Sequence, residues 1–295
     1  MKNSRCAGFA IRVALLYFTL ADVCQSMEAQ SEIRFRLVHD AIVVVSLTAD
    51  GQGPFDFVLD TGADTTIVDP VLAHKLSLVC LAPVQQTTLA GVQTLTSSSM
   101  RTLAAGPARV DNLVVLIQDL AELRRLDSHI EGIAGQNFLS HFNYLLDYRK
   151  HMVRVELANE IQDAIQGEKV PVEVSENRMI VASQAQSRGR TKLRLLVDSG
   201  ANSVVLIHAA SQALNLPIQE GGLELTSSGQ VGSQVGRVDM LTVGSQQFHD
   251  LAVALPAADP GERIGDGLLP TVLFQAIYIN NREGFIVFNP RVKKL

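Results

Sequence analysis

A chain of 295 residues is long enough for one large domain or two of ordinary size, and its 47% apolar and 19% charged residues are not those of a disordered protein. The formal net charge of −5 speaks against binding to nucleic acid. A 5% share of aromatic residues and the absence of Trp favour a core of Val, Leu, Ile and Ala, which suits β-strands with short helices.

The N-terminus has the order of charges and apolar residues that is typical of a secretory signal peptide. Lys2, Arg5 and Arg12 precede an apolar run over residues 13–21. We expect residues 1–26 to be the signal peptide of a periplasmic or secreted protein. The run is short for a membrane span, so no stable span is expected after its removal. A buried N-terminal helix or a membrane anchor is the alternative.

Two strands and a hairpin are predicted next. Residues 33–37 alternate between apolar and polar side chains, and residues 41–45 are continuously apolar, so both segments predict strands. A turn over residues 50–54 returns the chain as a strand over residues 55–59, which ends at an aspartate. Beyond that aspartate, Asp69 followed by Pro70 predicts the start of a short surface helix.

The next segments complete a first lobe over residues 33–157. A polar stretch over residues 85–98 predicts a hairpin, residues 113–117 predict a buried strand, and residues 119–126 a helical turn or an insertion. Two apolar strands closed by a basic turn follow over residues 144–155. The charged segment 158–169 is interpreted as a linker, and residues 170–290 as a second lobe in which the pattern restarts.

A duplicated motif supports this division. Apolar residues lead into Asp60-Thr61-Gly62-Ala63-Asp64, and 138 residues later apolar residues lead into Asp198-Ser199-Gly200-Ala201-Asn202. The same spacing matches Leu76 with Leu214, Gly91 with Gly229, and Leu113 with Leu251. An ungapped register over so many positions indicates a tandem duplication. Beyond Leu251 the spacing shortens, and Pro270 takes the place of Gly135.

The two acidic motifs resemble the active-site turns of retropepsin-like and pepsin-like aspartic proteases, here in a tandem, single-chain form. The resemblance implies a mainly β, two-lobed, acid-protease-like β-barrel fold with pseudo-two-fold symmetry and short helices. It also implies that Asp60 and Asp198 are catalytic. The residues implied to support the turns are Thr61, Gly62, Ala63, Ser199, Gly200 and Ala201.

Further roles follow from the same resemblance. The hydroxyls of Thr61 and Ser199 are expected to bond to the backbone of the opposite turn, and Asp64 and Asn202 to brace the turns or line the cleft. The hairpin over residues 85–98 and its counterpart in the second lobe are expected to be flaps. The substrate-contacting flap residues would be Ala90, Gly91 and Gly229. The replacement of a glycine by Pro270 departs from the family pattern and puts the detail of the second supporting turn in question.

The chemistry expected of such a site is peptide-bond hydrolysis. Two carboxylates about 3 Å apart cannot both ionise, so they share one proton and can act as base and acid. The sequence therefore predicts a monomeric aspartic endopeptidase that acts on a peptide or protein substrate. The alternative is a peptide-binding protein that keeps the cleft without turnover, for which Pro270 and the absence of Tyr from the flap-like stretches are the observations.

Other chemistries find no support in the sequence. The seven His residues show no metal-ligand spacing, and no phosphate-binding or dinucleotide motif is present, so neither a metal nor a cofactor is expected. Cys6 and Cys24 lie within the predicted signal peptide, which leaves Cys80 without a partner for a disulfide. Because its neighbours are apolar, Cys80 is expected to be a buried, small hydrophobic residue.

Overall fold

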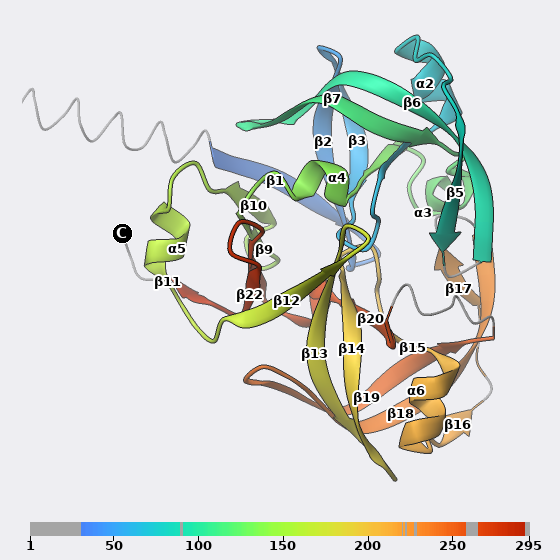
Figure 1. The fold of residues 1–295 in the computed structure, drawn as a ribbon, viewed down its shortest axis with the longest axis vertical. Helices are drawn as coiled ribbons and strands as arrows, with labels where there is room; N and C mark the ends of the chain where they lie inside the picture. The colour runs from blue at the N-terminus through green and yellow to red at the C-terminus, as the bar shows by residue number, and fades with distance from the viewer. Residues whose placement is uncertain are drawn as a thin grey trace, which may run out of the picture.

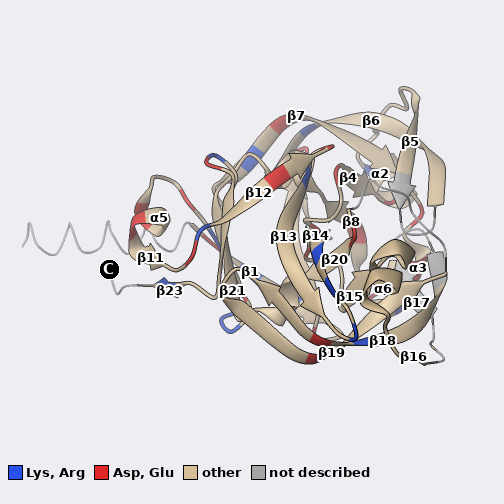
Figure 2. Cartoon of the chain, turned by 60° about the horizontal axis from the view of Figure 1, so that its bottom comes forward, with Lys and Arg blue, Asp and Glu red and all other residues tan. Residues whose placement is uncertain are grey.

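Two β-rich lobes, joined by a sheet to which both contribute, make up the fold (Figure 1). The computed structural model describes residues 31–88, 91–219, 221, 223–226, 229–257 and 265–292. The predicted signal peptide 1–26 lies outside these residues. Within them, no helix combines the length and the apolar character needed to cross a membrane. Basic and acidic residues both occur along the ribbon of each lobe (Figure 2).

The first lobe consists mainly of strands, with three short helices between them. Its predicted hairpins, its buried strand over residues 113–117 and its first helix are all present. Its elements are β1 (Glu32–Val38), β2 (Ile42–Ala49), β3 (Gln52–Leu59), β4 (Thr66–Val68), α2 (Pro70–Lys75), β5 (Pro83–Thr88), β6 (Gly91–Ala105), β7 (Ala108–Ile117), α3 (Ala121–Leu126), β8 (Ile130–Ala134), α4 (Gln136–Leu139), β9 (Tyr144–Asp147) and β10 (Met152–Val155).

The second lobe repeats this order after the short elements α5 (Glu160–Ala164) and β11 (Ile165–Gln166). Its elements are β12 (Val170–Ser175), β13 (Arg178–Gln186), β14 (Arg190–Asp198), β15 (Val204–Leu206), α6 (His208–Leu214), β16 (Ile218–Gln219), β17 (Leu223–Thr226), β18 (Gly229–Val243), β19 (Gln246–Pro256), β20 (Gly267–Pro270), η2 (Thr271–Leu273), β21 (Ala276–Asn280), β22 (Phe285–Phe288) and β23 (Arg291–Val292). The expectation of a mainly β, two-lobed fold with pseudo-two-fold symmetry and short helices is confirmed.

Local sequence explains how the elements begin. The Asp69 side chain accepts a hydrogen bond of 2.9 Å from the Val71 N–H, and Pro70 is the first helical residue, so α2 begins where the sequence predicts. In β2 the inward-facing residues are apolar, and Val43 and Leu47 are almost fully buried. These side chains belong to a core that continues through both lobes.

A six-stranded antiparallel sheet joins the lobes, at the left in Figure 1, with the order β1-β10-β9-β21-β22-β12. Its centre is the pairing of β9 from the first lobe with β21 from the second, where Leu146 lies opposite Ile277 and both are buried. The hydrogen bonds of this pairing and the burial of its apolar side chains hold the two lobes in a fixed relation.

Candidate active site

The acidic turns lie where one strand of each lobe ends beside a parallel neighbour. β3 ends at Leu59, which pairs with Ala134 of β8, and the Asp60 N–H donates a 3.0 Å hydrogen bond to the Ala134 carbonyl. In the second lobe β14 ends at Asp198, which pairs with Pro270 of β20. Each aspartate is therefore positioned by a buried pair of strands, at matched places in the two lobes.

The two turns face each other closely. A Cβ atom added to Gly62 would lie 2.6 Å from the carboxyl carbon of Asp198, and one added to Gly200 would lie 2.8 Å from that of Asp60. Each glycine thus lies against the carboxyl group of the other lobe, and any side chain there would displace it. The Asp60 and Asp198 carboxyls come within hydrogen-bonding distance of each other.

Backbone N–H groups fix the orientation of both carboxyls. Oδ1 of Asp60 accepts hydrogen bonds of 2.8 Å from Gly62 and 3.1 Å from Ala63. Oδ1 of Asp198 accepts one of 2.7 Å from Gly200, and the Ala201 N–H also bonds to this carboxyl. Since these donors belong to the tight turns themselves, the second oxygen of each carboxyl is free to face the other lobe.

The hydroxyls next to the aspartates lock the turns together. The Thr61 hydroxyl donates to the Val197 carbonyl at 2.8 Å and accepts from the Ser199 N–H at 3.0 Å. The Ser199 hydroxyl donates to the Leu59 carbonyl at 2.7 Å and accepts from the Thr61 N–H at 3.0 Å. Both side chains are almost completely buried. Each hydroxyl thus bonds to the backbone of the opposite turn, which is the arrangement that the family resemblance implies.

Burial changes the acidity of the pair. Loss of water raises the pKa of Asp198 well above its ordinary value, and the negative charge of Asp60 raises it further. Burial also raises the pKa of Asp60, against the opposing effect of the Gly62 and Ala63 N–H groups and of the Arg178 charge. One proton shared by two carboxyls is the state that this environment favours.

Several supporting residues had no signal in the sequence. The Gln136 side chain, from the start of α4, donates a 3.1 Å hydrogen bond to the Thr61 carbonyl. Arg178, at the start of β13 in the second lobe, forms an ion pair of 3.3 Å with Asp64 of the first lobe. Because these partners are far apart in the chain, only the folded structure brings them to the turns.

The second supporting turn is built differently from the first, as Pro270 suggested. After Pro270 the chain forms the 3-10 helix η2 instead of a helix like α4. The strand before it, β20, still pairs in parallel with β14 up to Asp198. The proline thus alters the turn without removing the strand that supports the second aspartate.

The flap-like hairpins are present, as β5–β6 and β17–β18. Gly91 opens β6 with a φ of +111°, and Gly229 opens β18. The third predicted flap residue, Ala90, lies outside the described residues. β17 of the second lobe lies against α3 of the first, so α3 bridges the lobes near this hairpin.

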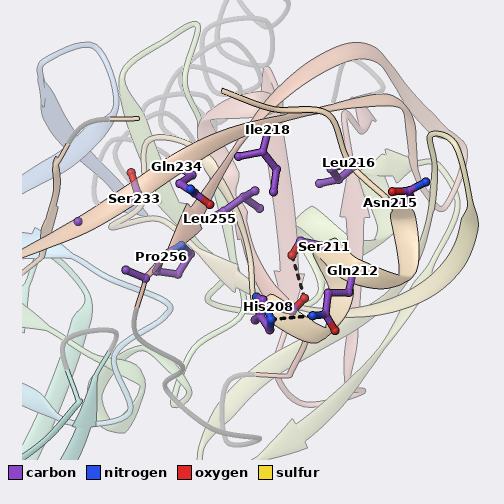
Figure 3. A pocket seen from close by; sticks show the side chains of 12 residues that line it. His208, Ser211, Gln212, Asn215, Leu216, Ile218, Ser233, Gln234, Leu255 and Pro256 are labelled. Carbon is purple, nitrogen blue, oxygen red and sulfur yellow. Dashed lines mark hydrogen bonds between the residues drawn. The ribbon is translucent and has the colours of Figure 1, made fainter. Parts of the chain in front are cut away.

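A cavity of about 620 Å³ lies elsewhere in the second lobe, between α6, β18 and β19 (Figure 3). Neither aspartate lines it. Ser233 lies at its wall, at the place that Leu95 takes in the first lobe, where Leu95 packs against a cluster that includes Leu120 and Leu123.

Two further observations concern residues singled out from the sequence. Cys80 is exposed, so the expectation of a buried residue is wrong. The segment around Cys80 runs beside β6, where the Leu81 N–H donates a hydrogen bond to the Ser97 carbonyl. The side chains of Val79 and Leu81 are exposed. Within the described part of the chain, no three His, Cys, Asp or Glu side chains gather in a way that could hold a metal ion.

Comparison with known proteins places these features in a family. The family described as aspartyl protease matches twice, over residues 45–138 and 183–271, once in each lobe. No curated protein matches the chain. Among solved structures, a retropepsin-like aspartic protease from Rickettsia conorii shares 14% identity with a TM-score of 0.34, over 43% of this chain and 92% of that one. The two family matches cover more than half of the chain, which belongs to the aspartyl protease family.

Proposed function

We propose that this chain is an aspartic endopeptidase in which Asp60 and Asp198 together activate a water molecule. The observation that carries the proposal is the arrangement of the two turns. Each lobe contributes one carboxyl, each glycine lies against the opposite carboxyl, and the hydroxyls of Thr61 and Ser199 bond reciprocally across the interface. These reciprocal contacts hold the two carboxyls against each other, which is the arrangement that joint action on one water molecule requires.

The chemistry follows from the shared proton. An ionised carboxyl accepts a proton from water as the water oxygen attacks the peptide carbonyl carbon, and the protonated carboxyl hydrogen-bonds the carbonyl oxygen as negative charge develops there. Burial raises the pKa of both groups, which keeps one of them protonated at a pH where an exposed aspartate would be ionised. The pair can therefore supply a base and an acid at the same time.

The proposal extends to the whole chain. Residues 1–26 would direct export to the periplasm or outside the cell, and the mature protein would act as a monomer, because one chain contributes both carboxyls. Lobes over residues 33–157 and 170–290, joined by the linker 158–169, would close on a peptide or protein substrate. Ala90, Gly91 and Gly229 at the hairpins would contact its backbone.

Cleavage of an unbiased peptide mixture, from acid to neutral pH, tests the proposal. The mature wild-type protein is compared with Asp60→Asn and Asp198→Asn, each expected to lose at least about 10³-fold in kcat/KM. Asp250→Asn is a matched control, because the Asp250 side chain is 77% exposed in a hairpin of the second lobe. It should retain the wild-type rate. A folded wild-type protein that cuts no peptide at any pH would favour the peptide-binding alternative.

A further inference from the structure

The two acidic turns differ in charge at one matched position. The fourth residue after the aspartate is Asp64 in the first turn and the neutral Asn202 in the second. The Asp64 side chain is only 22% exposed, whereas Asn202 is an exposed residue. A duplication that began with two equal halves has therefore kept or gained a charge beside one catalytic carboxyl only.

The second lobe places a buried cation against this charge. Arg178 is 3% exposed, and its Nη2 lies 3.3 Å from Oδ2 of Asp64. Its neighbour Asn177 donates a 2.9 Å hydrogen bond to the Asp64 backbone carbonyl, while Gln86 donates one of 3.0 Å to Asp64 Oδ1. The turn between β12 and β13 is thus docked on the first acidic turn through a hydrogen bond and an ion pair.

The corresponding turn of the first lobe carries no such cation. Arg178 is the first residue of β13, and the residue at that place in the first lobe is the buried, uncharged Ile42, the first residue of β2. A positive charge held in a poorly solvated place acts strongly on a carboxylate close to it. Burial raises the pKa of Asp60, and the charge of Arg178 opposes part of that rise.

We propose that Arg178 makes the catalytic pair unequal, so that Asp60 is the ionised member and Asp198 the protonated one. This assignment rests on the proposed function. Asp60 takes a proton from water as the water oxygen bonds to the carbonyl carbon, and the Asp198 proton passes to the carbonyl oxygen. These two transfers give a tetrahedral gem-diol intermediate. When its carbon–nitrogen bond breaks, the proton on Asp60 passes to the leaving amine and one hydroxyl of the diol returns a proton to Asp198. Asp60 is then ionised and Asp198 protonated, as at the start.

The other groups near the pair agree with this direction. Asp198 faces Asp60 across the lobes, Asp64 lies on the same turn, Arg178 comes from β13, and Tyr148 follows β9 on the Asp198 side. Burial raises the pKa of both carboxyls. The charge of Arg178 opposes this rise for Asp60, whereas the charge of Asp60 adds to it for Asp198. Tyr148 is a neutral phenol whose pKa is itself raised by burial.

The direct test is NMR titration of the mature protein labelled with ¹³C at the aspartate carboxyls. The two signals of the pair are assigned by their loss in Asp60→Asn and in Asp198→Asn. We expect the Asp60 carboxyl to ionise at the lower pH of the two. In Arg178→Met its titration should move up by about one pH unit, because a favourable charge is lost. This measurement does not depend on activity.

Kinetics give a second, independent readout. Activity requires an ionised Asp60, so the acid limb of the kcat/KM profile follows its pKa. Arg178→Met should shift this limb to higher pH by about one unit, and Arg178→Lys, which keeps the charge, should restore most of it. Asp64→Asn removes a negative charge near Asp60 and should shift the limb to lower pH, a change of sign that mere destabilisation would not produce.

A matched control separates charge from packing. Arg124→Met breaks another ion pair with a buried aspartate, Asp69, in the first lobe, and should leave both titrations of the pair unchanged. Our assignment is wrong if Asp198 ionises first, or if Arg178→Met leaves the Asp60 titration in place. Equal shifts in Arg178→Lys and Arg178→Met would also contradict it. A wild-type protein without peptidase activity would contradict the proposed function, while the NMR titration would still decide the assignment.

Discussion

The two lobes support their acidic turns by different means. In the first lobe the buried Thr66 donates to Asn137 Oδ1 twice, from its hydroxyl at 2.7 Å and from its N–H at 2.8 Å. Asn137 in turn donates to the Val114 carbonyl at 2.7 Å, and the Gly135 N–H bonds to the Thr66 hydroxyl at 3.3 Å. This side of the site is a polar network, which we call the Thr66 network.

In the second lobe the matched residues are apolar. Val204 takes the place of Thr66, Val272 that of Asn137, and Pro270 that of Gly135. Val204 is buried and Val272 packs against the core. Because a partly dismantled network leaves buried groups unpaired, its members are best lost together. Pro270 has no N–H to donate, and Val204 has no hydroxyl that could accept such a hydrogen bond, so both partners of the first lobe's Gly135–Thr66 bond are replaced together. Pro270 therefore gives no support to the alternative of a site that has lost its activity.

The largest effect is expected where the lobes are alike. Thr61→Val and Ser199→Ala each remove a buried hydroxyl that makes two hydrogen bonds, so each should lower the free energy of unfolding by about 3 kcal/mol. Thr61→Ser should cost less than about 1 kcal/mol, because Ser199 already does the same task. Urea denaturation measures all three. A much larger loss for one lobe than for the other would contradict an equal, reciprocal lock.

A smaller and unequal effect is expected in the Thr66 network. Asn137→Ala leaves the Thr66 hydroxyl, the Thr66 N–H and the Val114 carbonyl without this partner, so it should cost about 2 kcal/mol. The matched Val272→Ala only removes two methyl groups from a partly buried site and should cost about 1 kcal/mol. Denaturation curves of both variants provide the comparison, and equal losses would contradict the difference between the lobes.

The smallest effect on stability is expected at Gln136 and Thr271, which occupy matched positions directly after Gly135 and Pro270. Gln136 bonds to its own lobe, whereas Thr271 shares a 2.5 Å hydrogen bond with Tyr148 of the other lobe. Tyr148→Phe should therefore cost about 1 kcal/mol.

Tyr144→Phe is the matched control for this variant. Among the described residues the buried Tyr144 hydroxyl has no hydrogen-bond partner, so its removal should be neutral or slightly stabilising. Thermal unfolding distinguishes the two variants. Equal losses of stability would show that the contact between the lobes contributes nothing of its own.

Local chemistry explains which features the sequence could predict. The hairpins and the helix capped by Asp69 depend on short local patterns, and the reciprocal bonds of Thr61 and Ser199 are implied by the family resemblance of the duplicated motif. The Arg178–Asp64 pair and the Thr66–Asn137 bonds join residues that lie far apart in the chain, 71 residues in the second case, and no sequence spacing predicts them. The expectation that Cys80 is buried is wrong because apolar neighbours in the sequence predict burial only where a second layer of the structure covers them.

The sheet that joins the lobes has a consequence for how this site can be controlled. Strand β9 meets β21 within one chain, so the two halves of the site are held at an effective concentration set by the linker and not by the amount of protein. Dilution cannot separate them. Each half is also encoded separately, so a mutation beside one carboxyl leaves the residues beside the other unchanged. The two sides of the site can therefore come to differ one residue at a time.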